Sequence, residues 1–188
     1  MANSDNATGL TLAQKQSSPM GGRITRYVAL AATGTDIWVG GLVKPGGTAD
    51  ADGVMDVTGN ITTGDRVLGV VVGVEPVTNE SLTYRVASTL RYVFVADSPD
   101  AIFECQVSGA MAITAAGNIA DLTGFTTGRT YSGKSLIEVS SGTETTGDGD
   151  EDVLLLGLVQ RPGNEIGVNG KWLVKLNQHF YSNDSPGA

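Results

Sequence analysis

The sequence predicts a mainly β fold, a β-barrel or β-sandwich built from short strands. Glycine supplies 26 of the 188 residues, about twice its usual share of about 7%. This content indicates many tight turns and few helices, because glycine is costly inside a helix. Short runs rich in Val, Ile and Thr, residues that favour strands, recur between the turn residues. We expect an extended N-terminal arm over 1–22, a β domain over 23–180 with at most one short helix, and a polar tail over 181–188.

The first half of the β domain divides into strands and turns in a regular order. "RITRYVAL" (23–30) and "DIWVGGLVK" (36–44) are apolar runs typical of strands, whereas "KPGGTADADG" (44–53) has the composition of a loop. "DRVLGVVVGVEP" (65–76) alternates so that Gly69 and Gly73 share one face of a strand. Two glycines on one face indicate that a bulky group or another backbone lies close to it.

The second half begins with "RYVFVADSPDAIFECQ" (91–106), which we interpret as a hairpin of two strands around the turn Asp97–Asp100. The segment 109–123 is the best helix candidate, although Gly117 interrupts it. Strands are then expected at 135–141, at 152–160 and at 171–177. The nearly continuous apolar run "DVLLLGLVQ" (152–160) is typical of a strand buried on both faces.

The charge and the apolar pattern exclude two classes of partner. The formal net charge is −8, the wrong sign for neutralising phosphates, so we expect no direct binding to nucleic acid. The opening residues show neither the basic nor the apolar region of a secretion signal, and no apolar run approaches the roughly 20 residues of a membrane span. We therefore expect neither export by a signal nor a membrane partner.

Candidate chemistry is sparse, and we expect a protein that is not an enzyme and uses no cofactor or metal. Cys105 is the one cysteine and is expected to be a buried strand residue, while His179, the one histidine, follows the last strand in a polar segment. Acidic residues gather in loops, at Asp50, Asp52 and Asp56, and at Asp148, Asp150, Glu151 and Asp152. The second group lacks the further bidentate ligand of a helix-flanked calcium loop, which favours a solvated acidic loop.

Four stretches resemble a known group of proteins. They are "MANSDNATGL" (1–10), "VLGVVVGVEP" (67–76), "YVFVADSPDAIFECQ" (92–106) and "GLVQRPGNEIGVNGKWLVKLNQH" (157–179). In this order they are similar to the head decoration, or cement, proteins of tailed double-stranded DNA bacteriophages. The resemblance covers most of the chain and depends on strand and turn motifs.

The resemblance implies a virion structural protein on the outer surface of the capsid. Such a protein is expected to form a homotrimer, to bind the major capsid protein of the same phage, and to stabilise the shell against the internal pressure of DNA. We expect the polar arm, through Leu10, Leu12 and Gln14, to contact the capsid by entering a groove or adding a strand to a sheet edge; the alternative is a frayed terminus. The candidates for turns and subunit contacts are Asp97, Asp100, Arg161, Asn164 and Glu165.

Two other functions remain open from the sequence. The first is another virion component, such as a tail tube, a connector or the base of a head fibre, which would share the acidity and the β content. The second is a carbohydrate-binding β-sandwich that uses calcium through the loop around Asp150. Copy number on the particle separates the first from a decoration protein, and glycan binding with and without a chelator tests the second.

Overall fold

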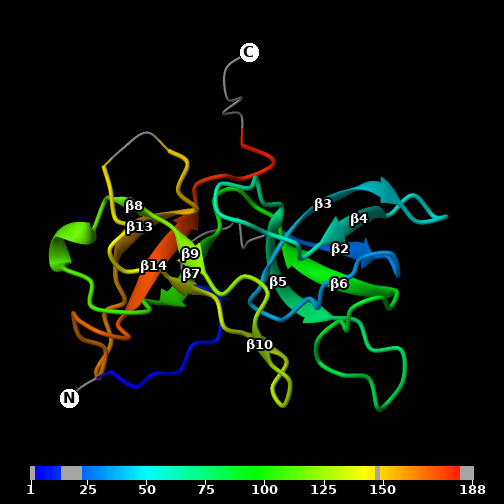
Figure 1. The fold of residues 1–188 in the computed structure, drawn as a ribbon, viewed down its shortest axis with the longest axis horizontal. Coiled ribbons are helices and arrows are strands. Elements are labelled where there is room, and N and C mark those ends of the chain that lie inside the picture. The colour runs from blue at the N-terminus through cyan, green and yellow to red at the C-terminus, as the bar shows by residue number, and fades with distance from the viewer. Residues whose placement is uncertain (1–2, 14–22, 147–148, 183–188) are drawn as a thin grey trace.

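The computed structural model describes residues 3–13, 23–146 and 149–182, and it confirms the mainly β class. A closed five-stranded barrel and a five-stranded sheet lie side by side along the long axis (Figure 1). The strand order around the barrel is β2 (Ile24–Ala29), β4 (Met55–Thr58), β3 (Leu42–Ala49), β5 (Gly69–Val74) and β6 (Arg91–Ala96). The order in the sheet is β1 (Thr11–Leu12), β7 (Ile102–Gln106), β14 (Lys171–Leu176), β13 (Val153–Leu158) and β8 (Ile119–Ala120).

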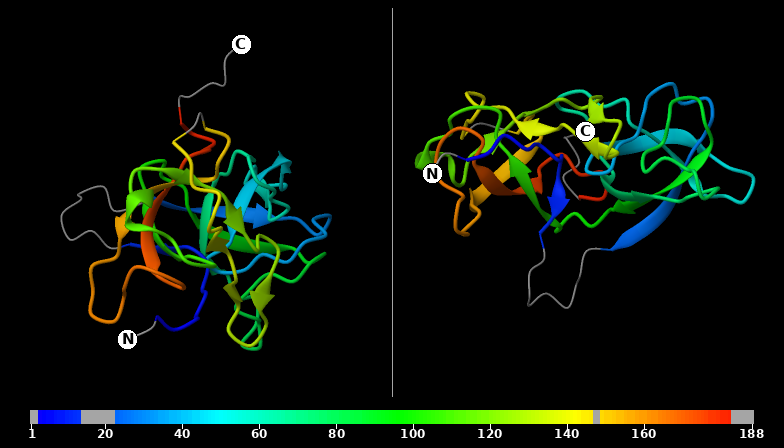
Figure 2. Two further views of the ribbon diagram at one scale, coloured as in Figure 1. Left: turned by 60° about the vertical axis from the view of Figure 1, so that its left-hand side comes forward. Right: turned by 90° about the horizontal axis from the view of Figure 1, so that it is seen from below.

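Short elements fill the connections between these strands, and the view from below in Figure 2 shows them along one side of the molecule. Strand β9 (Leu122–Thr123) pairs with β12 (Glu138–Val139), and β10 (Gly128–Arg129) forms a small hairpin with β11 (Lys134–Ser135). The described helical structure is one 3-10 turn, η1 (Ile113–Ala115). The described residues contain no helix with the length and apolar composition that crossing a membrane requires.

The barrel strands β3, β5 and β6 are each buried on both faces at one end: at the start of β3 and β5 and at the end of β6. Their inward residues, including Val43, Val71 and Val95, form the barrel core with Tyr27. Their outward residues Leu42, Val70 and Ala96 belong instead to the core beneath the sheet, with Phe103 and Trp172. Because side chains alternate between the two faces of a strand, one set of strands supplies both cores. The barrel and the sheet are therefore joined by apolar packing.

Strand β14 shows the alternation that its sequence predicts. Trp172, Val174 and Leu176 are buried, whereas Lys171, Leu173 and Lys175 are half-buried. The strand lies between β7 and β13, and both pairings are antiparallel. Its apolar face supplies much of the core beneath the sheet, while its lysines remain at the surface for ion pairs.

The predicted hairpin over 91–106 is wrong, although both of its strands exist. Strand β6 pairs with β2 and β5 in the barrel, whereas β7 pairs with β1 and β14 in the sheet. Each strand has partners on both sides, and the turn Asp97–Asp100 carries the chain from one unit to the other. The turn residues predicted that the chain reverses direction here. They did not predict which strands would pair with β6 and β7.

The helix predicted over 109–123 is also wrong. The segment contains only η1 and the two short strands β8 and β9. Ala112, the residue before η1, makes no side-chain capping hydrogen bond, and Gly117 adopts a φ of +91° that ends the turn. Without a cap and with few strong helix formers, the segment pairs with neighbouring strands instead.

Two strand predictions need smaller corrections. The loop expected at 44–53 is partly strand, because β3 continues to Ala49 with a bulge between Pro45 and Ala49 opposite Val57 and Met55. The strand at 152–160 is not buried on both faces, because Leu156 of β13 is 41% exposed. Strand β13 lies in a sheet with one covered face, so its outward leucine meets solvent.

Of the two glycines predicted to share a face in 65–76, Gly69 meets another backbone, whereas a Cβ on Gly73 would meet only the Phe94 side chain at 3.6 Å. A Cβ placed on Gly69 would overlap the carbonyl oxygen of Ala96 and lie 3.0 Å from the Cα of Asp97. These are backbone atoms of β6 and its turn, which cannot move as a flexible side chain can. The close approach of β5 to the end of β6 therefore requires glycine at this position.

We expect Gly69→Ala to lower the free energy of unfolding by about 1–3 kcal/mol, because the added methyl group overpacks against β6. Urea denaturation measures this change. Gly34→Ala is the matched control, since a Cβ on Gly34 meets no atom within 4 Å. Equal stability of the two variants would contradict the close approach.

Candidate interaction surface

Exposed apolar side chains occur on three loops that project from one side of the molecule and are spaced along its length. The loops are 75–90 between β5 and β6, the β10–β11 hairpin, and 159–170 between β13 and β14; all three extend downward in Figure 1 and toward the viewer in the right panel of Figure 2. Their large exposed residues are Val77, Leu82, Val86, Leu90, Tyr131, Ile166 and Val168, with exposures up to 84% at Tyr131. We call this set the apolar end. A concentration of apolar side chains at a surface is typical of a protein contact site.

Aromatic packing fixes two of these loops relative to each other. Tyr84, from loop 75–90, stacks on Trp38 with ring centroids 4.0 Å apart. The Trp38 indole lies over Gly128 of β10, where no Cβ would fit, and its Nε1 donates a hydrogen bond to the Thr126 carbonyl at 3.3 Å. The hairpin and loop 75–90 are therefore held by one buried aromatic pair, so their exposed tips form a defined surface.

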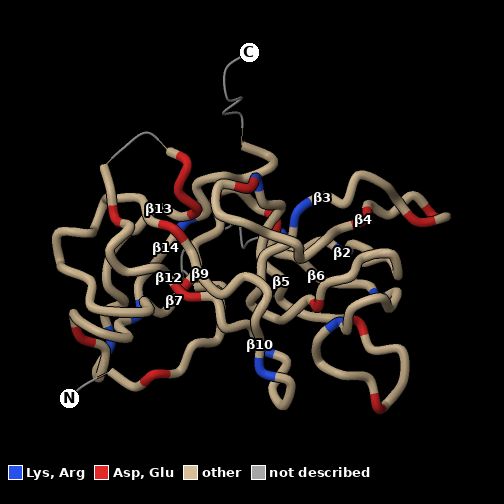
Figure 3. The backbone as a smooth tube through the Cα atoms, in the orientation of Figure 1, with Lys and Arg blue, Asp and Glu red and all other residues tan. Residues whose placement is uncertain are grey.

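The opposite end carries acidic residues (Figure 3). Asp121 lies between β8 and β9, and Glu144, Asp150 and Glu151 lie between β12 and β13. Burial, with the nearby charge of Glu151, raises the pKa of Asp121. We call these four residues the acidic end. The loops of the apolar end also carry exposed carboxylates, at Glu80 and Glu165.

Asp152, which adjoins the acidic end, has a structural role. Its carboxylate accepts hydrogen bonds from the backbone N–H groups of Gly64 and Leu122, and its side chain is buried. Burial raises its pKa, although the two hydrogen bonds oppose that shift. Asp148 lies outside the described residues. Among the residues that the structure describes, no group of three or more His, Cys, Asp and Glu side chains is arranged to hold a metal ion.

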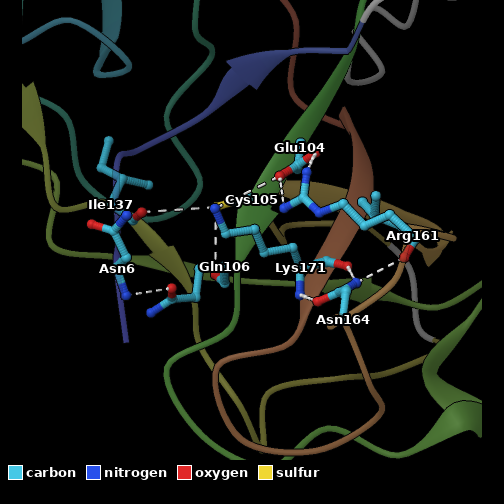
Figure 4. A network of polar contacts seen from close by, with 9 residues as sticks. Asn6, Glu104, Cys105, Gln106, Ile137, Arg161, Asn164 and Lys171 are labelled. Carbon is cyan, nitrogen blue, oxygen red and sulfur yellow. Dashed lines mark hydrogen bonds and ion pairs between the residues drawn. The ribbon is translucent and has the colours of Figure 1, made fainter. Parts of the chain in front are cut away.

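The loop 159–170 is braced by ion pairs from the sheet (Figure 4). Arg161 donates to both carboxylate oxygens of Glu104 at 3.0 and 2.7 Å, and the Lys171 ammonium lies 3.8 Å from the same carboxylate. The Asn164 side chain closes the base of the loop by bonding the Val159 carbonyl and both backbone groups of Lys171. Arg161 and Asn164 thus position the loop tip, with Ile166 and Val168, instead of presenting themselves to a partner.

The N-terminal segment is not a free arm over its described part, residues 3–13. Leu10 is 1% exposed within the core, and its N–H donates to the Gly40 carbonyl of the barrel region at 2.9 Å. Thr11 and Leu12 form β1, which pairs with β7. The capsid contact expected of Leu10 is therefore corrected, because an apolar side chain in a dry core cannot also fill a partner's groove. Leu12 is half-buried against the same core, and Gln14 lies outside the described residues.

Polar contacts hold the start of this segment against the apolar end. The Asn3 side chain donates to the carbonyls of Glu165 and Val168 and accepts from the Glu165 N–H, at 2.8 to 2.9 Å. Asn6 donates its N–H to the Gln106 side chain and accepts from Arg129 of β10, both at 3.0 Å. The segment 3–13 therefore links loop 159–170, the sheet, the hairpin and the barrel.

The two turn candidates have different environments. Asp97 has no exposed side-chain surface and accepts hydrogen bonds from Arg23 at 2.9 and 2.8 Å and from the Tyr27 hydroxyl at 2.6 Å. A subunit contact by Asp97 is corrected, because its oxygens are already satisfied inside the chain. Asp100 is 79% exposed and pairs with Lys175 at 2.8 Å. The structure brings Arg161, Asn164 and Glu165 together in one loop and places both aspartates at the junction between barrel and sheet.

The one cysteine and the one histidine of the chain are buried. Cys105 is in the core, and burial raises the pKa of its thiol to about 12. His179 is 1% exposed, and its Nδ1 accepts a hydrogen bond from the Tyr181 N–H at 3.0 Å. Burial lowers the pKa of His179. Its packing in the core was missed by the sequence interpretation, since polar residues surround it in the chain.

No family model, no curated protein and no solved structure matches this chain.

Leu10→Ala is expected to lower the free energy of unfolding by about 2–5 kcal/mol, because it leaves a cavity between the N-terminal segment and the core. Leu156→Ala, at an exposed leucine of the sheet, is the control and should cost about 1 kcal/mol or less. Thermal or urea unfolding measures both. If the Leu10→Ala protein were as stable as the control, the N-terminal segment would not be packed against the core.

Asp97 makes the stability depend on pH in a defined direction. Burial opposes ionisation of this carboxyl, but hydrogen bonds from Arg23 and Tyr27 outweigh it and hold the pKa below its usual value. A lowered folded-state pKa contributes stability above the unfolded pKa of about 3.9, and this contribution is lost as the pH falls through the folded value.

We therefore expect Asp97→Asn to cost about 1–3 kcal/mol of unfolding free energy at neutral pH, because the pair with Arg23 loses its charge and the buried Tyr27 hydroxyl loses a carboxylate acceptor. The difference from the native protein should shrink below about pH 4, where the native carboxyl also becomes protonated. Urea unfolding between neutral and acidic pH measures it. A difference that stays constant across this range would show that ionisation of Asp97 does not contribute.

Proposed function

We propose that the protein is a capsid decoration protein that binds the outer surface of an icosahedral phage head as a homotrimer. The observation that carries the proposal is the set of exposed apolar side chains on three loops that project from one side of the molecule. A protein that attaches to a shell needs one adhesive side and one side compatible with water. The resemblance of four sequence stretches to decoration proteins supports the same function.

The apolar end is the surface that would meet the major capsid protein. Tyr131 and the apolar residues of loops 75–90 and 159–170 supply contact area. Tyrosine is enriched among the hot-spot residues that contribute most of the binding free energy of protein interfaces. The Trp38–Tyr84 stack and the Arg161–Glu104 pair hold these loops before binding. Preorganised loops lose less conformational entropy on binding than flexible ones do.

A trimer would bind the shell with a higher overall affinity than one subunit, even if each contact is weak. Three apolar ends linked in one particle bind with an effective concentration set by the trimer geometry, so each contact can be individually weak. Contacts that cross the boundary between neighbouring shell subunits must break before the shell opens under the pressure of packaged DNA. The acidic end would face outward, where its charge limits adhesion to nucleic acid.

Co-sedimentation tests this proposal. The purified protein is mixed with expanded shells of its own phage from which the decoration protein has been stripped, and bound copies are counted per shell subunit. Saturable binding near one copy per subunit is expected. Binding of a handful of copies per particle would indicate a tail or vertex component, and no binding would remove the decoration function.

Tyr131→Ser is expected to weaken shell binding at least tenfold, a loss of about 1.4 kcal/mol. Ile113→Ser is the matched control, because Ile113 is a 70% exposed apolar residue on η1, outside the apolar end. Circular dichroism and thermal unfolding establish that both variants are folded. Equal loss in both variants, or no loss in Tyr131→Ser, would place the shell contact elsewhere.

A further inference from the structure

The β10–β11 hairpin differs in charge from the two other loops of the apolar end. Its charged residues are Arg129 and Lys134, and it contains no Asp or Glu. Loops 75–90 and 159–170 instead carry the exposed carboxylates of Glu80 and Glu165. Figure 3 shows the basic colour on the hairpin, below the label β10. In a chain with a net charge of −8, this hairpin is a local exception.

The two cations of the hairpin lie beside each other. Arg129 is the register partner of Lys134 in the antiparallel pair of β10 and β11. Register partners in such a pair have their side chains on the same face, and like charges directly opposite each other destabilise the pairing. The hairpin therefore keeps a repulsive pair at a position where opposite charges would stabilise it.

No carboxylate among the described residues pairs with these cations. Arg129 donates to the neutral Asn6 side chain at 3.0 Å, and the Lys134 ammonium has no hydrogen-bond or ion-pair partner in the described part of the chain. Six other basic residues do form ion pairs with carboxylates, at 2.7 to 3.8 Å. These pairs are Arg23–Asp97, Arg26–Glu75, Lys44–Asp65, Arg161–Glu104, Lys171–Glu104 and Lys175–Asp100. The positive charge of the hairpin is therefore left for a partner.

The hairpin presents these charges from a fixed stem. The Val39 N–H donates to the Gly133 carbonyl and the Val39 carbonyl accepts from the Ser135 N–H, both at 2.9 Å. A Cβ on Gly133 would overlap the Thr83 side chain, so the hairpin packs closely on loop 75–90. With Trp38 against Gly128 as well, the stem is held on several sides. The tip, with Tyr131 84% exposed, projects from this support.

The charge pattern favours a protein surface that carries carboxylates over two other partners. Nucleic acid would meet two cations on a strongly acidic chain, whereas phosphate binding needs a wider basic surface. A neutral apolar surface would bury Arg129 and Lys134 without compensating charges, which costs free energy. Carboxylates on a partner protein would pair with both cations and also relieve their mutual repulsion.

We infer that the hairpin docks against an acidic surface of the major capsid protein, where carboxylates pair with Arg129 and Lys134 and the Tyr131 ring makes the apolar contact. The inference rests on the proposed function, because it names the chemistry of the shell surface that the apolar end meets. The same acidic surface would repel Glu80 and Glu165 on the neighbouring loops. Complementary charge therefore selects which loop meets it and so fixes the orientation of the protein on the shell.

Lys134 offers the cleanest test, since its side chain makes no contact by hydrogen bond or ion pair that a substitution would remove. Binding is measured with stripped, expanded shells emptied of DNA, so that phosphates cannot supply the contact. Lys134→Gln is expected to bind at least threefold more weakly than the native protein at about 0.05 M salt, and this ratio should shrink at about 0.5 M salt because salt screens the lost attraction. Lys134→Arg keeps the charge and should keep the affinity.

Thr114→Asp is the matched control, because it changes the net charge by the same amount at an exposed residue of η1, outside the apolar end. It is expected to bind as the native protein does, and thermal unfolding establishes that all variants are folded. Equal binding of Lys134→Gln and native protein, a ratio that salt leaves unchanged, or an equal loss in Thr114→Asp would overturn the inference while shell binding itself stands. Failure of the native protein to bind these shells would instead remove the proposed function, and the inference with it.

Discussion

The architecture depends on the ends of three barrel strands, β3, β5 and β6, that are buried on both faces. Val71 and Val95 point into the barrel, while their neighbours Val70 and Ala96 point into the core of the sheet. The contact between β5 and β6 is close enough that Gly69 has no room for a side chain. Because the same strands supply both cores, a disturbance of one core is transmitted to the other. The barrel and the sheet consequently form a joint scaffold from which the loops of the apolar end extend.

Local patterns predicted this scaffold well where one physical signal dominated. The alternation of Trp172, Val174 and Leu176 identified the buried face of β14, and the glycines of 65–76 indicated a neighbouring backbone. Strand pairing could not be predicted, because the turn Asp97–Asp100 fits a hairpin and a crossover equally well. The N-terminal segment was misjudged for a similar reason: its polar residues resemble a free arm, but Asn3 bonds to Glu165 and Asn6 to Gln106, which lie 162 and 100 residues away in the sequence.

The candidate site was predicted only in part. Arg161, Asn164 and Glu165 do belong to one loop, as their spacing indicates, yet the first two are committed to bonds within the chain. The apolar end had no sequence signal, because its residues come from three loops separated by other elements. Tertiary contacts define this surface, and periodicity along the chain does not report it.

The central claim is that the apolar end attaches the protein to the shell with the acidic end outward. Electron cryomicroscopy of stripped, expanded shells saturated with the purified protein tests it most directly. The account predicts trimeric density on the outer surface in which the β10–β11 hairpin and loops 75–90 and 159–170 contact the capsid protein. Density with these loops facing solvent and the acidic end against the shell, or shells without added density, would contradict it.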